Sequence, residues 1–263
     1  MPEQLWFTKI LNHAFAGPVD WLLGFVQSAL HLPVAPRYPQ APISNAVAME
    51  VMVIALLLMF FILLRVRLSV ESPGGLQHTI EGFQAFIEGE SRNIIGHGSE
   101  RFATFLAPLF LFILIGNLFG VIPTLASPTA SPVVPLGLAL CTFAYYQVQG
   151  LREHGISYLK QFLGPVWWLA ILMLPLEIIS HLARLLSLTI RLYANMFAGE
   201  LVTLVFLSLV PIGIPVIFLG LHIFVALLQA YIFALLVMVY LAGFSSRMRG
   251  MITGREVPVK ESL

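Results

Sequence analysis

The chain reads IPVIFLGLHIFVALLQAYIFALLVMVYLAGF from Ile214 to Phe244, and this stretch contains no Asp, Glu, Lys or Arg. A helix that spans a bilayer needs about 20 mostly apolar residues, because every backbone group in hydrocarbon must be hydrogen-bonded within its own segment. The stretch is therefore long enough to cross. At about 1.5 Å per residue it would overshoot a hydrocarbon core of about 30 Å, so it must tilt steeply or lie partly along the interface.

The same apolar pattern recurs towards the N-terminus. Four further stretches are apolar enough to span a membrane, and they cover residues 43–64, 102–122, 133–148 and 167–209. With 59% hydrophobic and 10% charged residues, the 263-residue chain carries more apolar surface than a soluble domain of its length can bury. The sequence therefore predicts an all-α membrane protein with about five transmembrane segments, of which the last two are long and steeply tilted.

A shorter periodic stretch lies between the first two predicted spans. Apolar side chains recur there at helical spacing, with Gln and Glu residues between them, at Leu76, Ile80, Phe83 and Ile87. This pattern predicts an amphipathic surface helix that lies on the membrane or against a neighbouring protein. Packing against the protein's own loops is an equally open alternative.

The distribution of basic residues predicts the orientation, because loops rich in Lys and Arg stay on the cytoplasmic side. Five crossings place ten of the 14 basic residues on one side, against Lys9 and Arg37 on the other. The ten are Arg65, Arg67, Arg92, Arg101, Arg152, Lys160, Arg247, Arg249, Arg255 and Lys260. We therefore expect an outward-facing N-terminal segment of residues 1–42, a membrane domain of residues 43–246 and a cytoplasmic tail of residues 247–263.

Charge and cysteine content exclude several classes of protein. The 14 Lys and Arg residues against 13 Asp and Glu residues leave a formal net charge of +1, which offers no excess of positive charge to bind a nucleic acid backbone. Cys141 is the single cysteine, so the chain cannot form an internal disulfide or a cysteine metal cluster. We expect neither a metal site nor a bound cofactor.

Several ionisable side chains stand in the fourth apolar stretch, where each costs roughly 2.5 to 3.5 kcal/mol at mid-membrane. At about 100° per residue, one face of the helix carries Glu177, His181, Arg184, Arg191 and Asn195. Glu200 follows Arg191 by nine residues, so it lies about 180° round the helix and faces elsewhere.

Some of these side chains have a simple alternative explanation. Glu177 can neutralise either Arg184 or His181, which are two turns and one turn away. Arg184 lies near the predicted cytoplasmic end, so its guanidinium can extend to the lipid headgroups. Arg191 lies about 10 Å deeper along the helix axis, which makes it the strongest functional candidate.

The remaining polar candidates lie in other turns and other spans. In the last span, His222 and Gln229 are seven residues apart and stack on one face of an otherwise apolar helix. Gln229 and Asn195 also suit hydrogen bonds that join helices, and a buried histidine such as His222 is often only a packed residue. Glu50 is a weaker candidate near the outward end of the first span.

Two parts of these helices closely resemble subunit a of F-type ATP synthases. They are SLTIRLYANMFAGE from Ser187 to Glu200 and HIFVALLQAYIF from His222 to Phe233. By this resemblance, Arg191 matches the essential arginine of the family and Asn195 the asparagine one turn after it. Glu200 and His222 match the polar pair of a half-channel, and Gln229 matches the glutamine of the last helix.

The resemblance implies a proton-translocating subunit that is not catalytic by itself. In that family, two tilted helices lie against a rotating c-ring of small proteolipid subunits, and two aqueous half-channels meet the ring on either side of the arginine. The implied partners are the c-ring, the subunit b stalk and, indirectly, the soluble ATPase head, in a bacterial plasma (inner) membrane. His222 favours H⁺ over Na⁺. Leu185 stands where the family often has a proline, which leaves the helix shape there open.

Two other classes of protein also use intramembrane charges. A secondary ion-coupled transporter should show internal repeats and broken helices in matching halves, and the sequence has no visible repeat. An intramembrane hydrolase or metalloenzyme needs a nucleophile with its base, or several metal ligands, and Glu177 with His181 supplies only two groups. Neither class accounts for an arginine, an asparagine and a glutamate in the order found here.

Overall fold

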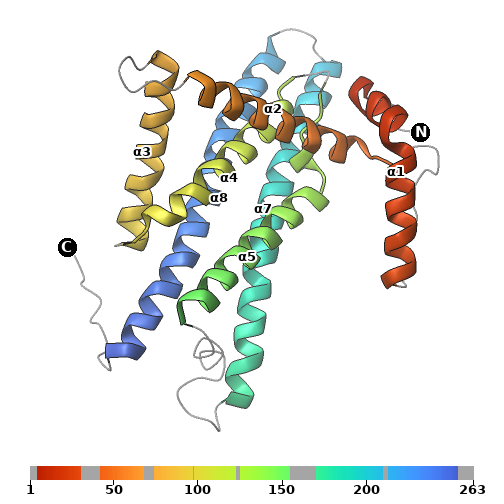
Figure 1. Ribbon diagram of the computed structural model, residues 1–263. Helices are drawn as coiled ribbons and strands as arrows, with labels where there is room; N and C mark the ends of the chain where they lie inside the picture. Colours follow the sequence, from red (N-terminus) through yellow and green to blue (C-terminus); the bar gives the residue numbers. More distant parts are fainter. Residues whose placement is uncertain are drawn as a thin grey trace. The chain divides into compact units, whose positions relative to one another are not determined.

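The structure of the chain is a computed structural model, which describes residues 5–30, 42–67, 74–96, 98–122, 125–154, 170–209 and 213–253. Every regular element in these ranges is helical (Figure 1). The elements are α1 (Trp6–Leu30), α2 (Asn45–Arg67), α3 (Gly75–Ile95), α4 (Glu100–Phe119), the 3₁₀ helix η1 (Pro128–Ala130), α5 (Val133–His154), α7 (Ala170–Leu209) and α8 (Ile214–Thr253). The predicted all-α fold is confirmed.

Four helices of the described ranges are long and apolar enough to cross a membrane, as judged by length and composition. Their apolar segments are Asn45–Val66, Glu100–Phe119, Pro175–Leu209 and Pro215–Gly243, which agree with four of the five predicted spans. The last two belong to α7 and α8, each of 40 residues. A helix of that length is about 60 Å long, roughly twice the thickness of the hydrocarbon core. Their tilt in a bilayer stays a prediction.

Helix α5 covers the remaining predicted span, over Val133–His154. It is not among the four helices that are apolar enough to cross. Its second half carries polar and tyrosine side chains that lower its hydropathy, namely Tyr145, Tyr146, Gln147 and Gln149. A fifth crossing through α5 therefore stays a prediction.

Helix α1 lies in the N-terminal segment and was not identified from the sequence, because Lys9, Pro18 and Asp20 interrupt its apolar pattern. Helix α1 is hydrogen-bonded to the residues that precede α2. The buried side chain of Asn12 donates a hydrogen bond of 3.1 Å from Nδ2 to the carbonyl oxygen of Ile43, and its Oδ1 accepts one of 3.0 Å from the Ile43 amide.

At the other end, α8 continues to Thr253, so the first part of the predicted tail 247–263 is helical. The rest of that tail, residues 31–41 of the N-terminal segment and residues 167–169 of the fourth predicted span lie outside the described residues. The side of the membrane on which each end lies stays a prediction.

The chain forms two compact units. The first unit contains Met1–Arg67, Phe112–Pro135 and Ile190–Gln229, and the second unit contains Leu68–Leu111, Leu136–Thr189 and Ala230–Leu263. Helices α4, α7 and α8 each contribute one part to each unit.

In the first unit, apolar side chains of α2, α4 and α7 form the core. The largest of those that are fully buried are Met49, Val53, Ile113, Leu192 and Met196. The helix η1 packs against α2 and lies close to α4, where a Cβ at Gly116 would be 3.4 Å from Pro128 Cγ. The η1 part of the connection between α4 and α5 is thereby packed onto the core.

In the second unit, aromatic pairs join the helices. The ring centroids are 5.3 Å apart for Phe83 and Phe110, 6.2 Å for Phe86 and Tyr231, and 3.9 Å for Phe105 and Tyr145. The first two pairs join α3 to α4 and α8. The predicted amphipathic helix therefore forms, as α3, and its aromatic side chains pack against the protein's own helices. Its contact with a membrane surface stays a prediction.

Candidate functional site

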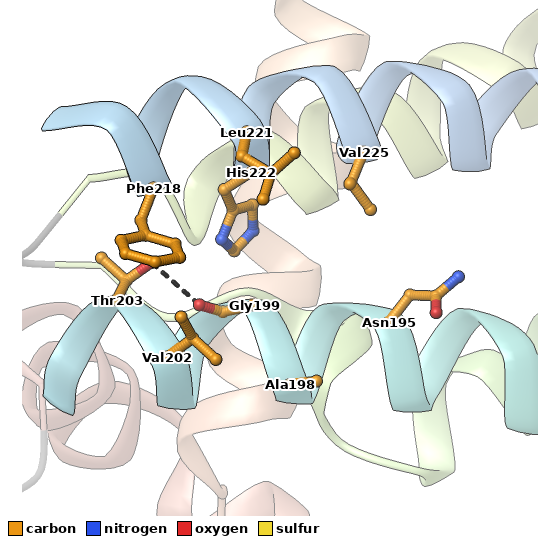
Figure 2. Close-up of a pocket in the computed structure, with 9 residues that line it drawn as sticks. All are labelled: Asn195, Ala198, Gly199, Val202, Thr203, Phe218, Leu221, His222 and Val225. Carbon is orange, nitrogen blue, oxygen red and sulfur yellow. Dashed lines mark hydrogen bonds between the residues drawn. The ribbon is translucent and has the colours of Figure 1, made fainter. Parts of the chain in front are cut away.

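Helices α7 and α8 lie side by side in the first unit (Figure 2). The Nδ2 atom of Asn195 donates a hydrogen bond of 2.9 Å to Oε1 of Gln229, and Gln229 is only 2% exposed. This is the helix-joining bond that packing alone predicts for these residues. It also fixes the direction in which both amides point.

His222 projects from α8 towards α7 and lies against the backbone of Gly199 (Figure 2). A Cβ at position 199 would be 3.0 Å from His222 Nδ1, so the glycine leaves room for the ring. His222 is 3% exposed, and neither ring nitrogen has a hydrogen-bond partner among the described residues. A buried polar group without a partner costs about 1 to 3 kcal/mol, so water is the natural partner of this ring.

A cavity of about 300 Å³ lies beside the His222 ring. Its lining, drawn in Figure 2, consists of Asn195, Ala198, Gly199, Val202, Thr203, Phe218, Leu221, His222 and Val225. A water molecule takes up about 30 Å³ in the liquid, so the space admits several. Asn195, Thr203 and His222 supply the polar side chains that such water needs.

Glu200 lies in the wall of a second cavity of about 350 Å³. Its Oε1 atom accepts a hydrogen bond of 2.6 Å from the backbone amide of Ser127. Apolar side chains and backbone form most of the remaining wall, which includes Gly120, Ile122, Leu125, Leu204, Pro215 and Leu219. An ionisable group is thus held at the edge of a space that is otherwise mainly apolar.

Thr203 lines both cavities. Its hydroxyl donates a hydrogen bond of 2.8 Å to the carbonyl oxygen of Gly199, which is the dashed line in Figure 2. Glu200 and His222 therefore lie in neighbouring spaces along the same two helices. That they share one aqueous half-channel, as predicted from the sequence, stays a prediction.

Arg191 lies on α7 one turn before Asn195, and its side chain is half-buried. Leu192 and Met196, on the packed face of the helix, are fully buried. Large apolar side chains are exposed on the other side, at Ile190 (57%), Phe197 (44%) and Leu201 (45%). Arg191 thus stands at the border between the packed core and an exposed apolar surface of α7.

The second unit holds a separate polar group. His181 Nε2 is 3.6 Å from Glu177 Oε1, one turn earlier on α7. On the other side of the ring, the Tyr146 hydroxyl and His181 Nδ1 are 2.8 Å apart and hydrogen-bonded. The Arg184 guanidinium lies 5.2 Å from the centre of the Tyr240 ring, a cation–π contact. Of the two partners predicted for Glu177, the structure brings His181 into contact with it.

Comparison with known proteins identifies the family. The model of the ATP synthase A chain family matches residues 47–242. The chain is 56% identical to the ATP synthase subunit a of Koribacter versatilis, over 92% of this chain and 97% of that protein. It is 45% identical to that of Solibacter usitatus, over 89% and 97%, and 38% identical to that of Geotalea uraniireducens, over 76% and 87%. The chain belongs to the ATP synthase A chain family.

Membership of this family confirms the resemblance found in the sequence. An ATP synthase A chain is a multi-pass membrane subunit that works within a larger complex and takes part in ATP synthesis and ion transport. The matched region contains the described cavities of the first unit and the polar group of the second unit. Both sites therefore belong to the part of this chain that resembles its relatives.

Two features of the site were not predicted from the sequence. Tyr146 stands in the predicted span 133–148, where its hydroxyl in apolar surroundings is a signal, but no spacing rule pairs it with His181, 35 residues further on. Ser127 contacts Glu200 through its backbone amide. Nearly every residue type has such an amide, so the identity of the residue does not predict the contact. Only the folded loop reveals it.

Glu50 is half-buried on α2. It belongs to the first unit but is not among the residues that line the Glu200 and His222 cavities. In the described ranges, no three His, Cys, Asp or Glu side chains lie close enough to hold a metal ion.

Proposed function

We propose that this chain conducts protons through the membrane part of a bacterial F-type ATP synthase and couples their flow to the rotation of a c-ring. The observation that carries the proposal is the pair of cavities that share Thr203, one with Glu200 in its wall and the other beside His222. Ionisable residues inside membrane spans are costly and mark ion pathways. Glu200 and His222, beside adjoining cavities, supply two groups that can bind a proton one after the other.

The Glu200 and His222 cavities form the half-channel that opens to the outside. A carboxylate and an imidazole both bind and release protons, and imidazole does so near neutral pH. His222 has no hydrogen-bond partner among the described residues, so its ring nitrogens are available to water in the cavity. The Asn195–Gln229 bond joins α7 to α8 next to the His222 cavity, which Asn195 also lines.

Arg191 separates the two half-channels. Its guanidinium keeps its charge and cannot pass a proton on. It attracts an ionised carboxylate of the ring and favours the charged form, so each ring subunit releases its proton before it passes. The exposed apolar side chains beside Arg191, among them Ile190, Phe197 and Leu201, supply a surface against which the helices of ring proteolipids can slide.

The second half-channel leads past His181. Glu177, His181 and Tyr146 form a row of groups that bind or donate protons. These groups lie within or beside the apolar segment Pro175–Leu209. Protons leave the ring along this row on the cytoplasmic side. The energy is external, at about 2.3 kcal/mol for one charge that crosses 100 mV.

The proposed setting is the bacterial inner membrane, with the N-terminus outside and the C-terminus in the cytoplasm. The partners are the c-ring, the subunit b stalk and, through them, the soluble ATPase head. The surplus of basic residues on one side of the chain supports this orientation. A reporter fused after Leu263 should be cytoplasmic, and a cysteine at Ala130 should react with an impermeant reagent added outside. A reporter found outside would overturn the five-crossing topology.

The alternative predicted from the sequence, a secondary ion-coupled transporter, has no support from the family, whose relatives carry the name of an ATP synthase subunit. The two proposals differ in what drives the ion. A rotary subunit pumps protons only when ATP is hydrolysed by an attached head, whereas a transporter moves a solute along an ion gradient.

The test uses inverted membrane vesicles from cells that carry or lack this chain, in sodium-free and sodium-containing buffers. We expect ATP-driven acidification only in vesicles that carry the chain, and the same rate in both buffers. The c-ring and the soluble head should copurify with the chain. Equal acidification in vesicles that lack it would overturn the proposal, and acidification that requires sodium would overturn the choice of ion.

A further inference from the structure

A row of buried hydrogen bonds holds the loop that follows α4. The Ser127 hydroxyl donates to the Gly116 carbonyl oxygen at 3.0 Å and lies 2.6 Å from the Thr129 hydroxyl. The Thr129 hydroxyl donates to Asn117 Oδ1 at 2.6 Å. Thr129 and Asn117 are fully buried and Ser127 is 3% exposed. The two hydroxyls have two protons for three contacts, so the hydrogen bonds of Ser127 and Thr129 depend on each other.

This row ends at two points that matter for the proposed proton path. At one end, the Ser127 amide donates to Glu200 Oε1 at 2.6 Å. At the other end, Asn117 Nδ2 donates to the Ala226 carbonyl oxygen at 3.4 Å, on α8 one turn after His222. The loop that contacts Glu200 is therefore tied to the helix that carries His222, and all of these residues belong to the first unit.

Glycine at position 120 leaves the space that the contact requires. A Cβ there would lie 2.9 Å from Glu200 Oε1 and 3.0 Å from Ser127 Cβ. Cβ atoms essentially never approach a neighbour so closely, so a larger residue would push either the carboxylate or the loop away. The carboxylate thus accepts a hydrogen bond from the Ser127 amide and lies close to Gly120.

A hydrogen bond to a carboxylate is stronger than one between neutral groups and fixes its direction. From this geometry we infer that Ser127, Thr129 and Asn117 are positioning residues, which hold the Glu200 carboxylate at the wall of its cavity. Thr129 and Asn117 act at a distance, because they hold Ser127 and Ser127 holds Glu200. This inference rests on the proposed function, in which Glu200 exchanges protons.

The decisive variant is Thr129→Val, which keeps the shape of the side chain and removes both hydroxyl contacts. We expect ATP-driven proton pumping to fall about fivefold, the effect of losing one or two ordinary hydrogen bonds. Thr129→Ser restores the hydroxyl and should restore pumping. The matched control is Thr142→Val, because Thr142 is also fully buried but its hydroxyl donates a hydrogen bond within its own helix α5, to the Leu138 carbonyl oxygen at 2.7 Å. Each pumping rate is normalised to the amount of assembled complex.

A second variant approaches Glu200 from the other side. Gly120→Ala should also lower pumping about fivefold, because the new methyl group displaces the carboxylate or the Ser127 loop. Gly137→Ala is its control, since a Cβ at Gly137 meets nothing within 4 Å. Gly120→Ala keeps the inference testable even if Thr129→Val does not assemble, because it leaves every hydroxyl in place.

Glu200→Gln, measured in parallel, separates this inference from the proposed function. Loss of pumping in Glu200→Gln together with normal pumping in Thr129→Val and Gly120→Ala would overturn the positioning role and leave the proposed function intact. Normal pumping in Glu200→Gln would overturn the role of Glu200 itself. If Thr129→Ser were as impaired as Thr129→Val, the hydroxyl would not be the cause and the inference would be wrong.

Discussion

The two units each hold a histidine inside a long apolar helix, and the two differ in their partners. His181, in the second unit, is hydrogen-bonded to Tyr146 through Nδ1 and lies 3.6 Å from Glu177 through Nε2. His222, in the first unit, has no hydrogen-bond partner for either nitrogen among the described residues, although it is 3% exposed. Protein groups satisfy the first histidine, whereas the second needs water from its cavity.

The carboxylates of Glu177 and Glu200 also differ in their partners. Glu177 meets a histidine one turn away on its own helix, so its partner is local. Glu200 is bound by the amide of Ser127, 73 residues earlier in the chain, and its carboxylate borders a cavity. The second unit therefore holds a row of side chains in direct contact with one another, whereas the first unit holds Glu200 and His222 beside two separate cavities. We expect the two sites to respond differently to the same kind of substitution.

The largest difference in ATP synthesis is expected between alanine substitutions of the two arginines, Arg191 and Arg184. Arg191→Ala removes an insertion cost of roughly 2.5 to 3.5 kcal/mol, so a purely structural arginine would be lost without harm. If Arg191 separates the half-channels, its removal leaves the ring carboxylates without a counter-charge and opens a direct path. ATP synthesis in assembled membranes should then fall to background, while passive proton leak persists or rises.

Arg184→Ala is the matched control for that experiment, since Arg184 packs over Tyr240 and stays near the predicted interface. It should keep most of the synthesis rate. Arg191→Lys keeps a positive charge but loses the planar fork and can be deprotonated when desolvated, so it should fail as well. Synthesis near the unmodified level in Arg191→Ala would contradict the channel mechanism.

The next largest effect on ATP-driven pumping is expected from substitutions of the two histidines. Phenylalanine keeps a ring of similar size and removes both nitrogens, so His222→Phe should lower ATP-driven pumping about a hundredfold, the lower end of what a proton-transferring group contributes. His181→Phe should have a smaller effect, because Glu177 and Tyr146 remain in place. Initial rates of vesicle acidification measure both. A larger loss in His181→Phe than in His222→Phe would reverse the comparison.

The same contrast explains what the sequence predicts and what it does not. The Glu177–His181 contact and the stacking of His222 with Gln229 follow from helical spacing, because residues three, four or seven apart share a face. The spans follow from length and apolarity. The Ser127 contact depends on a loop that returns to α7 from far along the chain, and α1 is hidden by the charges and the proline within it. Tertiary contacts of this kind have no periodic signature.

A smaller effect is expected where a glycine faces His222. In Gly199→Ala the new methyl group would lie 3.0 Å from Nδ1, so the ring must move by a few tenths of an ångström and the cavity narrows. Overpacking of this kind costs about 1 to 3 kcal/mol, and pumping should fall about fivefold or more. Gly220→Ala is the control, because a Cβ there meets nothing within 4 Å. Equal rates in both variants would show that the position of the ring is unimportant.

The smallest effect is expected at the bond that joins α7 to α8. Gln229→Leu leaves Asn195 Nδ2 without the acceptor that now lies 2.9 Å away. Hydrogen bonds between membrane helices are worth about 0.6 kcal/mol on average, so pumping should change by about threefold. The exchanged pair Asn195→Gln with Gln229→Asn keeps one donor and one acceptor and should recover part of the loss, which a double-mutant cycle on the pumping rate measures. If Asn195→Gln alone or Gln229→Asn alone abolished pumping, the pair would belong to the proton path itself. It would then not be only part of the scaffold that holds the two helices together.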